Sequence, residues 1–106
     1  MYELDFLPEA IKEWKKLDNS IRLEFKKQLL EIQQSPDVVG FRLKGDLRDC
    51  HRIKAPRSGY RLIYRIKANA LVIVVIAVGK RENEEAYKVA LDRIMEMMRF
   101  SEDEKE

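Results

Sequence analysis

The chain has 106 residues, of which 45% are hydrophobic and 38% charged, and its formal net charge is +2. This length suits one compact domain, and the longest apolar run, residues 71–78, is far too short to span a membrane. The N-terminus carries acids and a proline in place of the cations of a signal peptide, so we expect a cytoplasmic protein without membrane contact. With one cysteine, Cys50, and one histidine, His51, an internal disulfide is excluded and neither a metal nor another cofactor is expected.

The first part of the chain predicts a strand followed by a helical hairpin. Residues 2–6 alternate between apolar and polar types, as a short strand does. Pro8 suits the first turn of a helix, and the sequence DNS at 18–20 interrupts this helix and can cap the next one. Pro36 ends the second helix, because the residue before a proline avoids the helical conformation. The second helix has an apolar stripe of Ile21, Phe25, Leu29 and Ile32.

Three further strands and one helix are predicted from residue 49 onward. The strands cover residues 49–55, 60–67 and 71–78, and the last is apolar on both faces, which places it in the interior of a sheet. The helix runs from about residue 84 to 100, and the acidic tail at 101–106 is expected to be disordered. We therefore expect an α+β fold. In it, the N-terminal strand and helical hairpin pack on a small, mainly antiparallel sheet of about four strands, and a C-terminal helix follows.

Positive charge is concentrated in the middle of the chain. Residues 42–81 carry roughly +9, whereas the two flanks together carry roughly −7. If Ile53 and Leu62 face the helices, strand parity gathers several cations of neighbouring strands on the opposite face. These cations are Arg52, Lys54, Arg61 and Arg65. Crowded like charges cost stability, so we expect this face to meet a polyanion, with a solvated basic surface as the alternative.

A basic face of this kind could cleave RNA without a metal ion or a histidine. In this reaction a 2′-OH attacks the adjacent phosphorus, and fixed guanidinium groups stabilise the charge that gathers on the phosphoryl oxygens. Arg61 could clamp the phosphate in this way. Lys54 is crowded by arginines that disfavour its charged form, so it could act as the general base. A simple phosphate contact is the alternative role for Lys54.

The stretch GKRENEEAY at 79–87 joins the last strand to the last helix. Its acids at 82–85 suit the positive end of that helix, whereas Lys80 and Arg81 are disfavoured there and are expected to face an anion. Arg81 could hold the leaving side of the scissile phosphate. Tyr87 could then stack on a base.

Several of these stretches resemble the RelE toxins of bacterial and archaeal toxin–antitoxin pairs, within the RelE/ParE superfamily. They are LKGD at 43–46, DCHRIKAPRSGYRLIYRI at 49–66, and VGKRE at 78–82 followed by a tyrosine. The resemblance covers nearly all of residues 2–95 and implies a single RelE-like toxin domain over residues 1–100. It also implies a ribosome-dependent, metal-independent endoribonuclease that cuts mRNA in the ribosomal A site and so inhibits translation.

The resemblance also carries the activity to particular positions of this chain. These positions are Arg52, Lys54, Arg61, Arg81 and Tyr87. Arg52 stands where the family commonly has a lysine, and since arginine keeps its proton, the base role falls to Lys54. Four further cations are expected to contact RNA: Lys44, Arg57, Arg65 and Lys80. His51 shares the face of Ile53 by parity and is expected to be a packed residue without a catalytic role.

The partners that the resemblance implies are the 30S subunit of the ribosome at its A site, the mRNA, and a RelB-like antitoxin. Operator DNA is expected to be bound only through the complex with the antitoxin. The antitoxin is expected to dock on the last helix at Ile94, Met95 and Met98. The adaptable apolar segment MEMMRF at 95–100 could instead pack within the domain.

Two other functions fit the same features. One is a non-enzymatic poison of the ParE type, which acts on DNA gyrase and shares the fold. The other is an RNA- or ribosome-binding module that has lost catalysis, for which Arg52 is the hint in the sequence.

Overall fold

The computed structural model describes the backbone of residues 1–104, and the side chains of these residues apart from Asn83 and residues 100–104. Seven main elements, joined by short 3₁₀ turns, follow one another along the chain. They are β1 (Glu3–Phe6), α1 (Pro8–Lys15), α2 (Asn19–Gln34), β2 (Cys50–Ala55), β3 (Tyr60–Lys67), β4 (Val72–Lys80) and α3 (Glu85–Glu104). This order confirms the expected strand, helical hairpin, sheet and C-terminal helix.

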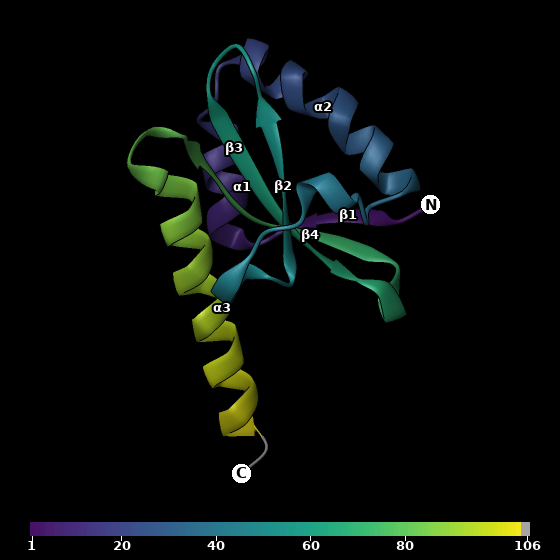
Figure 1. The fold of residues 1–106 in the computed structure, drawn as a ribbon, viewed down its shortest axis with the longest axis vertical. Coiled ribbons are helices and arrows are strands. Elements are labelled where there is room, and N and C mark those ends of the chain that lie inside the picture. Colours follow the sequence, from purple (N-terminus) through teal and green to yellow (C-terminus); the bar gives the residue numbers. More distant parts are fainter. Residues whose placement is uncertain (105–106) are drawn as a thin grey trace.

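The four strands form one mixed sheet in the order β1-β4-β3-β2. β1 is parallel to β4, and the other neighbours are antiparallel, so the sheet is mainly antiparallel as expected. The apolar strand β4 lies between two neighbours, where its backbone groups are paired on both sides. Helices α1 and α2 run beside the sheet, and α3 stands apart from them along another side (Figure 1).

The sheet has a packed core on each face. The first core joins α1 and α2 to one face and includes Phe25, Ile53 and Leu62. The second core joins α3 to the other face and includes Ile63 and Ala90. The face opposite Ile53 is therefore not the open basic surface that strand parity suggested, because α3 covers much of it.

A bulge in β4 shifts the alternation of its side chains between the two cores. Ile63 pairs with Ala77 and Tyr64 with Val75, which leaves Ile76 as an extra residue in the ladder. Ile76 and Ala77 are both buried in the second core although they are neighbours in the sequence.

An ion pair next to the bulge connects three elements. Arg93 of α3 donates from Nη1 to the Ile76 carbonyl at 2.7 Å and to Oε1 of Glu13 at 2.8 Å. Its Nη2 donates to Oε2 of Glu13 at 3.1 Å, so the pair is bidentate. Glu13 of α1 also accepts from the Val78 backbone N–H at 3.2 Å. Since both side chains are largely removed from solvent, the pair holds α3 and α1 against β4.

Gly79 permits the close approach of β4 to the first turn of α3. A Cβ at this position would lie 3.2 Å from the backbone nitrogen of Ala86 and 3.3 Å from its Cα. The absence of a side chain therefore lets the end of β4 touch the helix start. Arg81 and Tyr87 flank this contact along the chain.

The far end of α3 extends beyond the sheet (Figure 1). The helix continues to Glu104, past the expected end at residue 100. Residues 105 and 106 lie outside the described part of the chain, so the expected disorder of the tail at 101–106 stays a prediction. Among the described residues, no helix combines the length and apolar character that crossing a membrane requires.

Candidate active site

Six side chains from two strands, the turn after β4 and a helix line one open cavity of about 520 Å³. They are the five predicted catalytic residues, Arg52, Lys54, Arg61, Arg81 and Tyr87, together with Glu84. The cavity opens on the α3 side of the sheet, where the second core ends. The structure therefore brings the five predicted residues to one cavity, and their catalytic roles remain predictions.

The antiparallel pairing of β2 and β3 brings the central cations together. Lys54 pairs directly with Arg61 across the two strands, so their side chains leave the same face. Arg52 lies two residues before Lys54 and shares this face. Arg81 follows the end of β4, and Tyr87 belongs to the first turns of α3. Each wall of the cavity thus comes from a different element.

Hydrogen bonds hold several of these side chains in place. Arg52 donates from Nη1 to the Tyr87 hydroxyl at 3.0 Å, which links β2 to α3 across the cavity. Arg61 donates from Nη1 to the carbonyls of Gly59 at 3.3 Å and Tyr60 at 3.4 Å. The Gly59 carbonyl also accepts from the Arg81 backbone N–H at 2.9 Å. Gly59 has φ +78°, so the turn that offers this carbonyl requires a glycine.

The four cations differ in exposure but share a lack of counterions. Arg61 is 8% exposed, Arg52 is half-buried, and Lys54 and Arg81 are open to solvent. Across the described residues, none of the four makes an ion pair within 4.0 Å. Their charges are therefore available to an anion that enters the cavity. Guanidinium groups suit a phosphate because they offer several donors in a fixed plane.

Glu84 is the lining residue that the sequence did not identify. The acids at 82–85 were interpreted as helix-start residues, and this fits Glu85, with which α3 begins. Glu84 ends the short turn Glu82–Glu84 with φ +52°, in the left-handed region. Its side chain lines the cavity because the chain turns there, and no periodicity in the sequence marks such a turn.

The four cations expected to contact RNA lie outside this lining. Lys44 is in the loop before β2, and Arg57 is in the β2–β3 turn, where its backbone N–H donates to Glu24. Arg65 is half-buried on β3 opposite Cys50, and Lys80 is exposed at the end of β4. Their roles in RNA binding stay predictions.

The residues expected to bind an antitoxin divide between the two sides of α3. Ile94 is 7% exposed and belongs to the second core, so it is not part of a docking surface while α3 lies on the sheet. Met95 and Met98 are 57% and 58% exposed. Met97 packs against the second core, so part of the segment at 95–100 packs within the domain. Docking of an antitoxin on Met95 and Met98 stays a prediction.

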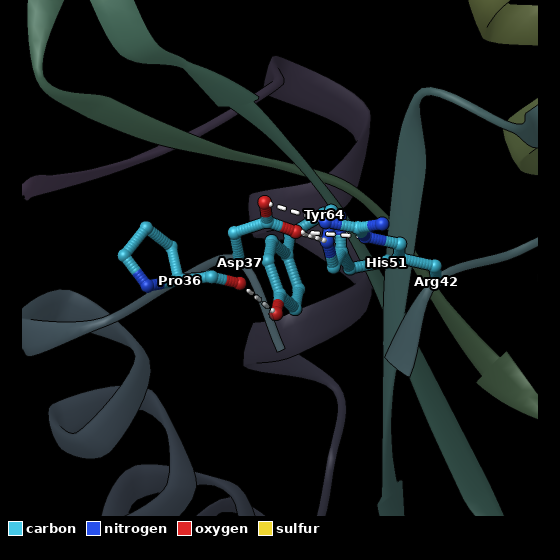
Figure 2. A network of polar contacts seen from close by, with 5 residues as sticks. All are labelled: Pro36, Asp37, Arg42, His51 and Tyr64. Atoms are coloured by element: carbon cyan, nitrogen blue, oxygen red, sulfur yellow. Dashed lines mark hydrogen bonds and ion pairs between the residues drawn. The ribbon is translucent and has the colours of Figure 1, made fainter. Parts of the chain in front are cut away.

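His51 lies on the opposite face from the cavity, as expected. It is 6% exposed and stacks on Tyr64 with ring centroids 5.2 Å apart. Its Nε2 lies 3.0 Å from Oδ1 of Asp37, and Arg42 forms a bidentate pair with the same carboxylate (Figure 2). The Tyr64 hydroxyl donates to the Pro36 carbonyl at 2.8 Å. This network closes the β2–β3 edge against the loop after α2.

Two pKa values near this network follow from its geometry. Hydrogen bonds from Arg42 and then from His51 lower the pKa of Asp37 from 3.8 to about 2. Burial raises the pKa of Tyr64, and the charge of Asp37 adds to this effect. Next to His51 in the chain, burial raises the pKa of the Cys50 thiol to about 11. The thiol is thus held protonated and unreactive, as expected for a packed cysteine.

In the described residues no three His, Cys, Asp or Glu side chains lie close enough together to hold a metal ion.

Comparisons with known proteins give consistent results. Residues 4–85 match the family model of the ParE toxin of the type II toxin–antitoxin system parDE. The chain is 45% identical over 94 residues to the mRNA interferase toxin RelE of Escherichia coli K12, covering 89% of this chain and 98% of that protein. It is 40% identical over 93 residues to a putative RelE-like toxin protein of E. coli, covering 88% and 97%.

Solved structures agree with these sequence relatives. A double arginine-to-alanine mutant of E. coli toxin RelE in the free state matches with a TM-score of 0.79 and 44% identity, covering 88% of this chain and 97% of that one. The intact E. coli RelBE toxin–antitoxin complex contains a chain with a TM-score of 0.74 and 43% identity, covering 78% and 100%.

Proposed function

The chain belongs to the RelE toxins of the RelE/ParE superfamily, and on this premise we propose that it is an mRNA interferase, the toxin of a toxin–antitoxin pair. One observation supports this function above all: the cavity gathers one tyrosine and four cations that form no ion pair with any described residue. The resemblance assigns activity to these same five positions. The reaction is attack by a 2′-OH on the adjacent phosphate, with cleavage of the bond to the 5′ oxygen.

The arginines of the cavity stabilise the phosphate as its charge increases. Arg61 is fixed by backbone carbonyls, and its buried position strengthens its effect on an anion in the cavity. Arg52 is held by Tyr87, and Arg81 lies at the opposite wall. Preorganised charges of this kind lower the barrier because they need not reorient during the reaction. Arginine does not give up its proton, so these residues act by charge and hydrogen bonding.

The substrate is mRNA in the A site of the ribosome. The cavity is open, so its lining residues alone would not hold a flexible RNA strand in the geometry that attack requires. A ribosome that presents an ordered codon would supply this geometry. Lys44, Arg57, Arg65 and Lys80 would then contact RNA around the cavity. Because ribosomes are cytoplasmic, the protein acts in the cytoplasm.

The second partner is a cognate RelB-like antitoxin. Solved complexes pair RelE of E. coli with its antitoxin RelB, and the E. coli RelE chain covers most of the present chain. The exposed Met95 and Met98 on α3 are the proposed docking residues. Binding there would engage the same helix that contributes Tyr87 to the wall of the cavity. Operator DNA would be bound through this complex.

Incubation with programmed ribosomes tests the function directly. With a codon in the A site, the purified chain should cut the mRNA, and intact mRNA under all conditions would contradict the proposal. Arg81→Ala should slow cleavage by a factor of about 10²–10³, since loss of one preorganised donor typically costs this much. Lys88→Ala removes an exposed cation of α3 that does not line the cavity, so its rate should stay close to that of the parent chain.

A gyrase assay separates the ParE-type alternative, which the name of the matching family model brings forward. Loss of supercoiling activity at toxin concentrations that leave mRNA intact would favour that function. Tight ribosome binding without cleavage would instead favour the module that has lost catalysis. The curated relatives at 40–45% identity are named as interferases and RelE-like toxins, which supports the cleavage reaction.

A further inference from the structure

Two side chains of α2 are hydrogen-bonded to the hairpin that carries the central cations of the cavity. Gln28 donates from Nε2 to the Lys54 carbonyl at 2.7 Å, and Glu24 accepts at Oε1 from the Arg57 backbone N–H at 3.0 Å. Lys54 lies near the end of β2, and Arg57 lies in the turn that follows this strand. The two hydrogen bonds therefore fasten α2 to the end of the β2–β3 hairpin, and together they are called the α2 clamp below.

The charges at the hairpin end oppose its closed form. Lys54 pairs directly with Arg61, and like charges opposite each other in a sheet are destabilising. Neither side chain forms an ion pair with any described residue. β2 is also an edge strand, so no further strand holds its outer side. Because local opening costs least where few contacts hold the chain, the hairpin end depends on its attachment to α2.

The α2 clamp lies next to the cavity. Arg52 and Lys54 line the cavity, and they also line a second hollow of about 210 Å³ beside α2. The other walls of this hollow are Gln28, Gly40 and Phe41. The hollow reduces packing on this side of β2, so the hydrogen bond from Gln28 is important for holding the backbone of Lys54 near α2.

The opposite side of the hairpin end is fastened to the end of β4. The Gly59 carbonyl accepts from the Arg81 backbone N–H at 2.9 Å and from Nη1 of Arg61 at 3.3 Å. The turn between β2 and β3 is thus held between α2 and the residue that follows β4. Lys54 keeps its position relative to the arginines of the cavity only while both attachments are in place.

We propose that Glu24 and Gln28 are positioning residues for RNA cleavage, which hold Lys54 and Arg61 in the geometry that the reaction requires. This inference rests on the proposed cleavage of mRNA. Neither Glu24 nor Gln28 lines the cavity, so both act through the backbone of the hairpin. Displacement of a catalytic group by about 1 Å can slow a reaction by about a hundredfold, even when the substituted residue lies away from the chemistry.

The decisive experiment compares Gln28→Met with Gln33→Met. Gln33 also lies on α2 and is half-buried like Gln28, but its Nε2 donates to the Tyr2 carbonyl at 3.1 Å, next to β1 and away from the hairpin. Methionine keeps the length of the side chain and removes the donor. Each variant loses one hydrogen bond from α2 to a backbone carbonyl, so both melting temperatures should fall by similar amounts.

Single-turnover cleavage of mRNA on programmed ribosomes then separates positioning from stability. The maximal rate of Q28M should fall at least about fivefold, while the toxin concentration that gives half of this rate stays unchanged. Q33M should cleave at the rate of the parent chain. A smaller fall for Q28M, an equal fall for both variants, or a raised half-saturating concentration for Q28M would overturn the assignment.

Conservative rescue tests the second residue of the α2 clamp. Glu24→Gln keeps an oxygen that accepts from the Arg57 N–H, whereas Glu24→Leu removes it. E24Q should retain the cleavage rate of the parent chain, and E24L should lose at least about fivefold. Equal losses in both variants would assign the effect to the charge of Glu24, and full activity of E24L would show that this hydrogen bond does not position the site.

Amide hydrogen exchange measures the α2 clamp without any cleavage. The amides of residues 54–61 should exchange faster in Q28M than in the parent chain, whereas the amides of β4 should not change. Unchanged exchange of the hairpin in Q28M would refute the clamp, whatever the cleavage rate. If the parent chain leaves mRNA intact while the hairpin responds as expected, the proposed function fails and the clamp itself is retained, so the two failures are distinguishable.

Discussion

Arg61 and Arg81 carry the same guanidinium group, yet their surroundings give them different structural roles. Arg61 is 8% exposed and donates to two backbone carbonyls of the β2–β3 turn region, whereas the side chain of Arg81 is exposed. Removal of the Arg61 side chain would therefore leave a packed site partly empty.

We predict that Arg61→Ala lowers both activity and stability, whereas Arg81→Ala lowers activity alone. The free energy of unfolding should fall by about 1–3 kcal/mol for R61A, because packing and hydrogen bonds are lost together. Urea unfolding followed by circular dichroism measures this difference. Equal stability of R61A and R81A would show that the buried contacts of Arg61 contribute little.

The Asp37 network predicts a dependence of stability on acid. The pKa of Asp37 is about 2 in the folded chain against 3.8 for an unperturbed carboxyl, so the folded state favours the ionised form. The resulting stabilisation is fully present above pH 3.8 and is lost as the pH falls towards 2. Asp37→Asn should therefore weaken the fall in melting temperature between about pH 4 and 2.

Arg42→Met provides the matched test of this cause. The hydrogen bond from Arg42 is the largest contribution to the lowered pKa of Asp37. Melting curves of R42M should thus show most of the same change in acid dependence while Asp37 is still present. An acid dependence like that of the parent chain would assign the effect to other carboxylates.

At the scale of elements, strand parity predicted which strand cations share a face. The turn before α3 and the packing of α3 on the sheet are known from the structure. Period-two alternation places Lys54 and Arg61 on the same face, so the sequence could group these cations, while their direct pairing is seen in the structure. The bulge at Ile76 leaves no such pattern, because every residue around it is apolar. An apolar strand on both faces implies two covered faces, and from this the position of α3 could have been inferred. Glu84 was missed because the residue pattern does not mark its left-handed backbone, with φ +52°.

Gly79→Ala should disturb the cavity through the contact between β4 and α3. The new Cβ would lie 3.2–3.3 Å from Ala86, so the helix start must shift by a few tenths of an ångström. This shift would move Tyr87 relative to Arg52, whose hydrogen bond crosses the cavity. We expect cleavage to fall by about tenfold to a hundredfold, because small displacements of catalytic groups are costly.

Gly40→Ala is the control for this substitution. A Cβ at Gly40 meets nothing within 4 Å, so the same chemical change should leave the fold and the cavity unaffected. Single-turnover cleavage and melting temperature of both variants should be measured together. A Gly79→Ala chain with full activity would show that the β4–α3 contact does not position the site.

For the whole molecule, the arrangement of two cores around one sheet gives α3 two roles. Its inner side closes the second core through Ala86, Ala90 and Ile94, and its first turns supply Tyr87 to the cavity. Its outer side leaves Met95 exposed. The far end of the helix extends beyond the sheet (Figure 1). A partner bound to the outer side of α3 would therefore contact the helix that contributes Tyr87 to the cavity.

The last prediction concerns this outer side. Met98→Glu should weaken binding of the cognate antitoxin tenfold or more, since burial of one large apolar side chain is worth about 1.5–3 kcal/mol. The free energy of unfolding of M98E should stay close to that of the parent chain, because Met98 is 58% exposed. Leu23→Glu on α2 is the matched control, as Leu23 is also an apolar residue with 56% exposure. Isothermal titration of the antitoxin into each variant measures the affinities. Equal losses for both variants, or none for M98E, would remove the outer side of α3 as the docking surface.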